Sequence, residues 1–258
     1  MKEKRIMEKF YVGNIDGTVS FLDIENYLGI TEFLSPEETH EYISKTISPL
    51  ADCVKKHQGY VCQVQGDCIM AVFGHNNNCT RHALCAANCA LEQQELIEKI
   101  NPVPVNSYKL PLAARIGISS GPMYACYCET NANADYTVLG KKVNIAARLQ
   151  KINKRYATNI LIDETVFANI KENIITRELD MVKIDGCTET MRLYEVLSTA
   201  DNCEKEIVNW KEYYEEGLRY YFCGEWNRAI QCFSRIEDDK ASYMMIERCK
   251  RRKSQIVD

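Results

Sequence analysis

Two aspartates stand beside short apolar segments that predict β-strands, and they constrain the fold more than any other feature. Asp23 follows the largely apolar run Val19–Leu22, and Asp67 precedes the apolar run Ile69–Phe73. A carboxylate in an apolar strand costs free energy unless it is paired or holds a metal ion. Gly66 permits a tight reversal between two strands at Asp67. The two residues therefore predict either strand ends that cap turns or a site for Mg²⁺ or Mn²⁺.

A third segment, which follows Gly140, has the periodicity of a helix. Asn144 and Arg148 are four residues apart, so both side chains project from one face of that helix. Arginine offers a planar set of donors for phosphate, and asparagine offers an amide that can hold a ribose or an oxyanion. Taken alone, this pair is more simply explained as a solvated helix face.

Together these segments resemble, in order and spacing, the catalytic domain of the class III adenylate and guanylate cyclases. The resemblance runs from about Thr18 to Leu197. It implies an α+β, ferredoxin-like (βαββαβ) domain, and the predicted order of strands and helices agrees with that arrangement. The blocks that carry it are Phe21–Ile24, Gly66–Asp67, Met70–Gly74, Arg115–Pro122, Tyr136–Gly140 and Val143–Arg148.

The resemblance implies an active site shared by two chains in a head-to-tail homodimer. One chain would contribute Asp23, Asp67 and the carbonyl of Ile24 as ligands of two Mg²⁺ or Mn²⁺ ions. The other would contribute Asn144, which orients the ribose, and Arg148, which stabilises charge on the α-phosphate. The implied reaction converts ATP to 3′,5′-cyclic AMP and pyrophosphate by two-metal-ion catalysis.

The residues that would bind the base do not decide whether the substrate is ATP or GTP. Gln63 stands where adenylate cyclases of this family usually carry Lys and guanylate cyclases carry Glu. Thr137 occupies the second selecting position, as it does in many adenylate enzymes. A glutamine amide both donates and accepts, so it suits adenine or guanine. We expect ATP as the substrate, with GTP or mixed specificity as the alternative.

Some positions depart from the family pattern. Asp185 and Cys187 stand where the family has two lysines for the triphosphate, so Lys183 is the expected substitute. An acidic residue beside a triphosphate opposes binding. Asn26 stands where the family commonly has Gly. The alternative to an active enzyme is therefore a degenerate cyclase-like module that binds a nucleotide or a protein partner.

The composition excludes several other classes of protein. A formal net charge of −4 over 258 residues gives no basic footprint for nucleic acid. No apolar run reaches the length of a membrane span, and the N-terminus lacks the apolar core of a signal peptide. The 13 cysteines predict reduced thiols in a cytoplasmic protein. One group could bind zinc but is better explained by helix packing: His75, Cys79, His82, Cys85 and Cys89.

Helix and strand signals follow one another along the chain. Ser35, Pro36 and Glu38 form a capping box with proline at the first helical position, and Gly59 is expected to end that helix. The other expected elements are a hairpin over 60–65 and 68–73, a helix over 80–100, strands over 112–119 and 123–128, a loop over 129–134, a helix over 143–154, a strand over 159–162, a short helix from 163, and β segments up to 184 and over 191–196.

We divide the chain into a lead-in (1–16), a catalytic domain (17–198) and a helical extension (204–250). In the extension an aromatic helix containing Gly217 precedes a turn at Gly224 and a second apolar helix. This resembles one tetratricopeptide-type helical pair, although a plain helical extension fits equally. The basic run 250–253 is expected to be solvated.

Overall fold

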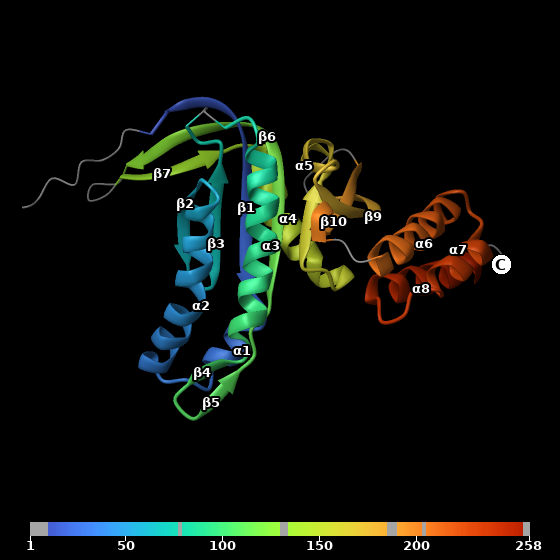
Figure 1. Cartoon of the computed structure of the whole chain (residues 1–258), viewed down its shortest axis with the longest axis horizontal. Helices are drawn as coiled ribbons and strands as arrows, with labels where there is room; N and C mark the ends of the chain where they lie inside the picture. Colours follow the sequence, from blue (N-terminus) through green and yellow to red (C-terminus); the bar gives the residue numbers. More distant parts are fainter. Residues whose placement is uncertain (1–9, 77–78, 130–133, 185–189, 203–204, 255–258) are drawn as a thin grey trace, which may run out of the picture.

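The structure is a computed structural model that describes residues 10–76, 79–129, 134–184, 190–202 and 205–254 (Figure 1). The expectations for Asp185 and Cys187 lie outside these residues. The elements of the described chain are, in order, β1 (Gly13–Ile24), α1 (Tyr27–Thr31), α2 (Pro36–Lys56), β2 (Gly59–Gln65), β3 (Cys68–Phe73), α3 (His82–Ile100), β4 (Val103–Val105), β5 (Tyr108–Leu110), β6 (Ala114–Glu129), β7 (Ala134–Leu139), α4 (Lys141–Tyr156), β8 (Ile160–Asp163), α5 (Glu164–Ile170), β9 (Ile174–Lys183), β10 (Thr190–Thr199), a 3₁₀ turn (Ala200–Asn202), α6 (Lys205–Phe222), α7 (Trp226–Phe233) and α8 (Lys240–Ser254).

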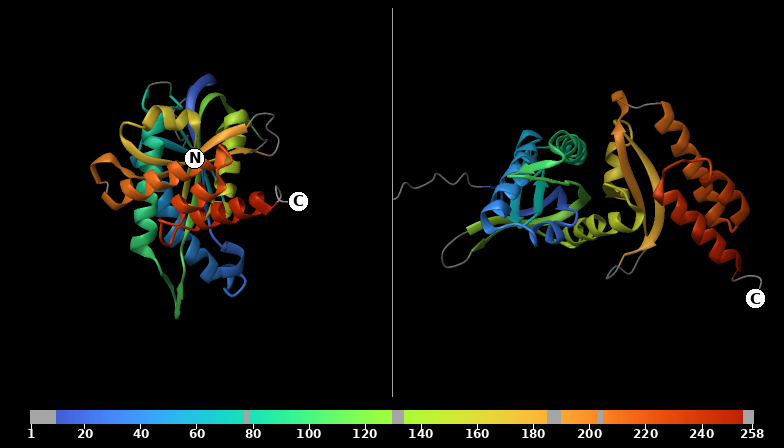
Figure 2. Two further views of the ribbon diagram at one scale, coloured as in Figure 1. Left: turned by 90° about the vertical axis from the view of Figure 1, so that its right-hand side faces the viewer. Right: turned by 90° about the horizontal axis from the view of Figure 1, so that it is seen from below.

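The main sheet has the strand order β2-β3-β1-β6-β8-β10-β9, and β7 pairs with β6. Its pairs are antiparallel except β6 with β8. The segment β1-α2-β2-β3-α3-β6 forms the expected ferredoxin-like unit, in which β1 lies between β3 and β6. Helices α2 and α3 cover one face of this unit, and α4 lies on the opposite face (Figures 1 and 2).

Side-chain alternation in β1 assigns its residues to the two faces of the sheet. Leu22 and Ile24 are buried in the core that includes residues of α2 and α3. Val19 and Phe21 belong to a second core, on the other face. Asp23 is in register with this second set, so its carboxylate projects toward the side on which α4 lies.

The first long helix begins as predicted. The Ser35 hydroxyl accepts a hydrogen bond from the Glu38 N–H, and the Glu38 carboxylate accepts one from the Ser35 N–H. The prediction that Gly59 ends this helix was wrong. His57 is the last half-helical residue, Gln58 takes the left-handed conformation at φ 62°, and Gly59 already opens β2.

The predicted break between two strands at Gly121 and Pro122 was also wrong, because β6 continues through both residues. On one edge Pro122 pairs with Asp16 of β1. On the other edge β8 pairs only up to Ile118, and β7 pairs only from Tyr124 onward. Pro122 therefore lies in a stretch of β6 that has no partner strand on this second edge, so its missing N–H removes no hydrogen bond between strands there. The sequence analysis also did not predict α1, β4, β5 or β7.

One glycine allows α4 to lie directly on the sheet. A Cβ atom added at Gly117 of β6 would stand 2.2 Å from the Ala146 carbonyl oxygen and 2.2 Å from the Gln150 backbone nitrogen. Only glycine permits this distance between strand and helix. The close packing fixes the helix that carries Asn144 and Arg148 against the centre of the sheet.

The C-terminal extension contains three helices in its described part rather than the expected pair. Helices α6 and α7 pack together with the Phe233 ring over Gly217, and α8 is the third helix. All three lie against the far end of the sheet (Figures 1 and 2). They share one core with α4 and β9, which includes Leu149, Leu179 and Tyr214. No helix among the described residues is long and apolar enough to cross a membrane.

Candidate active site

The two aspartates meet because of the register between β1 and β3. Asp23 pairs with Cys68, the residue that follows Asp67. Gly66 takes a left-handed conformation, with φ 59°, in the tight turn between β2 and β3. The two carboxylates are hydrogen-bonded to each other. The sequence prediction that they belong to one site therefore agrees with the geometry.

Each carboxylate is held in surroundings that disfavour its charged form. Burial raises the pKa of Asp23 to about 6, and the negative charge of Asp67 adds to this effect. Burial also raises the pKa of Asp67. In the opposite sense, Gln150 donates a hydrogen bond to Asp23 at 3.2 Å, and the positive charge of Arg115 also lowers the Asp23 pKa. The pair is therefore a concentration of negative charge that its protein neighbours only partly offset.

This donor set fits a hard divalent cation. Two neighbouring carboxylates in their deprotonated form offer oxygen ligands to one small ion or two. Ile24 lies one residue beyond the last pair between β1 and β3, next to Asp23. The chain then turns at Asn26, which takes a left-handed conformation with φ 56°. Asparagine tolerates this conformation better than most residues, so the replacement of the family's Gly keeps the backbone path.

A different face of α4 carries the expected phosphate ligands. Arg148 and Lys183 line one cleft of about 210 Å³, together with Lys151 and Arg155. Asn144 is exposed on α4, one turn before Arg148. The four α4 residues follow one another at helical spacings of four, three and four. The structure therefore brings Arg148 and Lys183 together, as the triphosphate expectation requires.

The two halves of the expected site involve different side chains of α4 within one chain. On α4, Gln150 is buried and contacts Asp23, whereas Arg148 lines the cleft beside Lys183. Among the described residues, the neighbours that shift the Asp23 pKa are Asp67, Gln150 and Arg115. A single chain thus contacts the carboxylate pair through Gln150 and lines the basic cleft through Arg148.

The two expected base-selecting residues lie on β2 and β7, which contact each other without pairing in the sheet. Thr137 of β7 forms a hydrogen bond with Cys62 of β2. Gln63 is exposed, and its amide donates to Gln65 at 3.5 Å. A register shift in β2 between Val61 and Gln63 places two residues opposite one on β3. This bulge was not predicted from the sequence, and Cys62 is the extra residue that it contains.

Comparison with known proteins identifies the domain. Residues 13–198 match the model of the adenylate and guanylate cyclase catalytic domain. The chain belongs to this cyclase family. Adenylate cyclase 1 of Rhizobium meliloti is 32% identical over 180 residues, which are 70% of this chain and 27% of that protein. Adenylate cyclase of Anabaena cylindrica is 30% identical over 186 residues, which are 69% of this chain and 36% of that protein.

A solved structure supports the same fold. The guanylate cyclase domain of RhGC from Catenaria anguillulae, solved in complex with GTP, superposes with a TM-score of 0.64 and 26% identity. The match covers 74% of this chain and 99% of that domain. The chain spans about a quarter to a third of the length of the two adenylate cyclases described above.

The sequence analysis missed several residues that surround the cyclase site. Gln150 and Arg115 both lower the pKa of Asp23, and Arg115 also forms an ion pair with Glu25 at 2.7 Å. Lys151 and Arg155 extend the basic cleft. The last two could have been found, because they continue the helix face of Asn144 and Arg148. Gln150 could not, because its contact depends on how closely α4 packs on β6.

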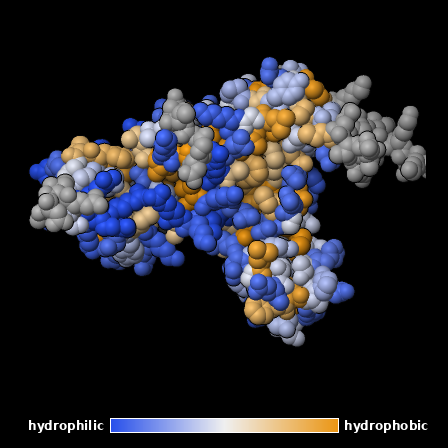
Figure 3. Space-filling view, turned by 180° about the vertical axis from the view of Figure 1, so that it is seen from behind, coloured by the Kyte–Doolittle hydropathy of each residue, from blue (hydrophilic) through white to orange (hydrophobic). Residues whose placement is uncertain are grey.

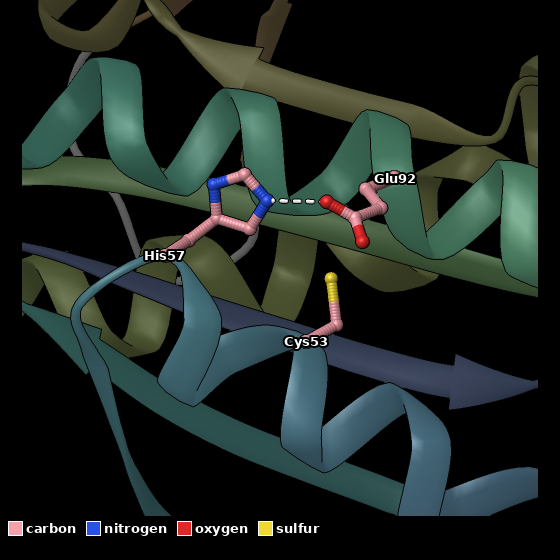
Figure 4. A group of neighbouring side chains, drawn as sticks. All are labelled: Cys53, His57 and Glu92. Atoms are coloured by element: carbon pink, nitrogen blue, oxygen red, sulfur yellow. Dashed lines mark hydrogen bonds and ion pairs between the residues drawn. The ribbon is translucent and has the colours of Figure 1, made fainter.

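A second group of potential metal ligands lies between α2 and α3 of the cyclase domain. Cys53, His57 and Glu92 place their ligand atoms within 4.8 Å of one another (Figure 4). His57 Nε2 lies 2.8 Å and Lys56 Nζ 2.7 Å from the Glu92 carboxylate, and these contacts lower the Glu92 pKa. Because two cationic or donor groups already satisfy this carboxylate, the group is an ion-pair network that joins the two helices.

The zinc group considered from the sequence does not converge. Among the described residues, its members form no cluster of metal-ligating atoms. His82 is held in the protein interior, where its Nδ1 lies 2.7 Å from the Thr18 hydroxyl. Cys89 is buried with its thiol 3.9 Å from that of Cys53. These contacts agree with the packing explanation.

Proposed function

We propose that this chain contains the catalytic domain of an adenylate cyclase that converts ATP to 3′,5′-cyclic AMP and pyrophosphate as a head-to-tail homodimer. The observation that carries the proposal is that different α4 side chains serve the two sets of residues on one chain. Gln150 is buried and donates to Asp23 of the carboxylate pair, whereas Arg148 lines the cleft that holds Lys183. A second, inverted copy would bring one surface of each kind to each nucleotide.

Exposed apolar side chains support an interface between two chains. Leu28 is 74% exposed, Phe33 79% and Leu139 54%. The side of the sheet that α2 and α3 leave uncovered also carries a group of apolar residues (Figure 3). Large exposed apolar patches on a protein commonly mark surfaces that bind another molecule. We therefore place the second chain on this side.

Asp23, Asp67 and the carbonyl of Ile24 would hold two divalent cations, Mg²⁺ or Mn²⁺. When bound, these ions supply positive charge to the triphosphate and increase the acidity of the ribose 3′-hydroxyl. The proposal is supported by the charge of the pair, since burial and mutual repulsion raise the pKa of Asp23 to about 6. A cation would remove that repulsion.

The chain's other residues orient the nucleotide and stabilise charge. Asn144 of the second chain would hold the ribose through its amide. Arg148 would donate to the α-phosphate oxygens, where charge develops as the 3′-oxygen attacks. A bond forms between the 3′-oxygen and the α-phosphorus, the bond to the pyrophosphate breaks, and the hydroxyl proton is released. Lys183, which shares the cleft with Arg148, would bind the outgoing phosphates.

Guanylate or mixed specificity is the second candidate function. Gln63 is exposed and its amide contacts only another glutamine amide among the described residues, so either orientation is open to it. The related RhGC domain was solved with GTP. We place ATP first because Thr137, beside β2, is the residue that many adenylate enzymes of the family carry.

Two further proposals concern the whole chain. We infer that α6 and α7 form a tetratricopeptide-type pair, which is supported by the Phe233 ring over Gly217. We also infer that the protein is cytoplasmic. Free thiols at the described cysteines support this location, because the cytosol keeps cysteines reduced.

The test is cyclic nucleotide formation by the purified protein, with ATP and GTP in parallel and with Mg²⁺ or Mn²⁺. We expect cyclic AMP from the wild type and none from Asp67→Ala. Asp52→Ala is the matched control, because Asp52 is an exposed acid of α2 that forms an ion pair with Lys55. Cyclic GMP as the main product would favour the second candidate. No product from a folded dimer would favour a degenerate binding module and overturn the proposal.

A further inference from the structure

A large basic cleft lies between the C-terminal helices and the cyclase domain, apart from the carboxylate pair. Its volume is about 1030 Å³. Hydrophilic residues extend between the C-terminal helices and the sheet on the side of the molecule opposite α2 and α3 (Figure 3). Five cationic side chains from three elements line the cleft: Arg155 of α4, Lys183 of β9, and Arg248, Arg251 and Arg252 of α8.

Most of this positive charge forms no ion pair between described residues, although the charge of Arg251 helps to lower the pKa of the exposed Glu247. Asp180 is the one acidic residue that lines the cleft among the described residues. Its carboxylate is already engaged, because it forms an ion pair with Arg248 and accepts a hydrogen bond from the Tyr156 hydroxyl at 2.6 Å. Ion pairs between described residues include none from the other four cations.

Cations that converge from separate elements repel one another, and an anion between them offsets that repulsion. Arginine is well suited to phosphate, because its planar donors match the phosphate oxygens. Several phosphates in a row fit a cleft of this size and charge better than a single carboxylate does. The preferred ligand therefore carries a polyphosphate chain.

One wall of the cleft is aromatic. Tyr221, Phe222 and Trp226 line it, and the Tyr221 and Trp226 rings are 5.4 Å apart in an edge-to-face arrangement. Phe222 is 44% exposed. Exposed rings beside cationic groups are the surfaces on which nucleotide bases stack. The aromatic wall adds a binding surface for a base to the binding surface for phosphates.

We propose that this cleft binds the polyphosphate chain of a nucleotide, at a site separate from the Asp23 and Asp67 pair. The site would link the C-terminal helices to catalysis. Arg155 and Lys183 line both this cleft and the smaller one that contains Arg148. The ion pair of Arg248 with Asp180 already joins α8 to the strand beside α4. A bound nucleotide would therefore couple the position of α8 to that of α4, the helix that carries Arg148.

Direct binding in the absence of metal ions tests the proposal. The full chain is titrated with ATP in EDTA, which removes divalent cations from the carboxylate pair. We expect binding by the wild type, and a loss of affinity of about tenfold or more in Arg251→Glu/Arg252→Glu, because two charge-assisted contacts become repulsive. Lys240→Glu/Lys250→Glu is the matched control, since it makes the same charge change on α8 at two exposed positions outside the cleft.

Two further measurements separate this site from the cyclase site and identify the ligand. Arg148 lines the smaller cleft but not this one, so Arg148→Ala must bind ATP in EDTA as the wild type does, and loss of binding in that variant would overturn the proposal. Tripolyphosphate must compete with ATP, whereas adenosine alone must compete far less. Unchanged ATP affinity in the double arginine variant, with melting temperature retained, or competition by adenosine but not by tripolyphosphate, would also overturn it.

Discussion

At the scale of single residues, the interior of the cyclase domain holds a histidine in its neutral form. Burial lowers the pKa of His82. Its Nδ1 lies 2.7 Å from the Thr18 hydroxyl, which is in turn 2.5 Å from the Ser120 hydroxyl. Below the ordinary histidine pKa of 6.5 the unfolded chain binds a proton that the folded protein does not. His82 therefore contributes stability that is present above that pH and is lost as the pH falls.

We predict that His82→Gln weakens the dependence of stability on pH. The melting temperature of the wild type is expected to fall as the pH is lowered from about 7 to about 5. In the variant it is expected to fall less, and the difference between the two should be roughly 2–4 °C for each 1 kcal/mol that His82 contributes. His40→Gln, at an exposed position of α2, is the control and should follow the wild type. Identical slopes for wild type and His82→Gln would contradict the assignment.

The sequence predicted individual site residues where chemistry alone marks them. Asp23 and Asp67 were identified because carboxylates are costly beside apolar strands, and the register of β1 and β3 brings them together. The role of Gln150 was missed because a polar residue on a helix gives no sign of its partner. That partner is decided by the packing of α4 on β6.

At the scale of elements, the contact between α4 and β6 positions the α4 side chains that we propose to bind the nucleotide. The distance between helix and strand is set by Gly117, whose missing side chain leaves room for the backbone of α4. Since both contacting atoms belong to the backbone, neither can move away by changing a rotamer. A larger residue at this position has to displace the whole helix.

We predict that Gly117→Ala destabilises the protein and lowers cyclase activity together. Overpacking costs typically about 1–3 kcal/mol, and the upper end applies here because a Cβ atom would stand 2.2 Å from backbone atoms. Thermal unfolding and cyclic nucleotide formation measure the two effects. A variant with unchanged melting temperature and full activity would show that α4 does not depend on this contact.

The elements themselves were predictable where local signals dominate. The capping box correctly predicted the start of α2, and Gly66 correctly predicted the turn between β2 and β3. The continuity of β6 was missed because Gly121 and Pro122 locally favour a break. In the folded protein the pairing with β1 carries the strand through them. Pairing between strands that are far apart in the sequence cannot be predicted from a short stretch of that sequence.

At the scale of the whole molecule, the C-terminal helices are joined to the cyclase domain by a buried cation. Arg177 of β9 is 3% exposed at its side chain. It pairs with Glu195 at 2.6 Å and, through both terminal nitrogens, with Asp239 at 2.8 and 2.9 Å. Its guanidinium also lies 4.5 Å from the Tyr214 ring centre. The extension is therefore part of one cooperative structure rather than a loosely attached tail.

We predict that Asp239→Ala costs roughly 3 kcal/mol of unfolding free energy, because it leaves a buried guanidinium with half of its partners. Glu237→Ala, at an exposed position two residues away, is the control and should change stability by less than about 0.5 kcal/mol. Denaturant unfolding measures both. Equal stability of the two variants would mean that the extension is not held through Arg177.

The size of the extension was predicted less well than its existence. Its first two helices were expected from their aromatic spacing, and α8 was missed because its buried positions are few. Ala241, Met245 and Cys249 recur every four residues among charged side chains. Two arginines of the basic run at 250–253 are exposed, as expected, and they also line the cleft beside α4. Only the tertiary arrangement places them opposite Lys183.

Mixing two inactive variants tests most directly whether one catalytic site is built from two chains. Asp67→Ala removes one surface of the site and Arg148→Ala removes the other, so each purified variant should form almost no cyclic AMP. In an equimolar mixture that exchanges subunits, half of the dimers combine the two variants and each keeps one intact site, so about a quarter of wild-type activity should return. A mixture as inactive as its components, with exchange demonstrated, would contradict the two-chain site.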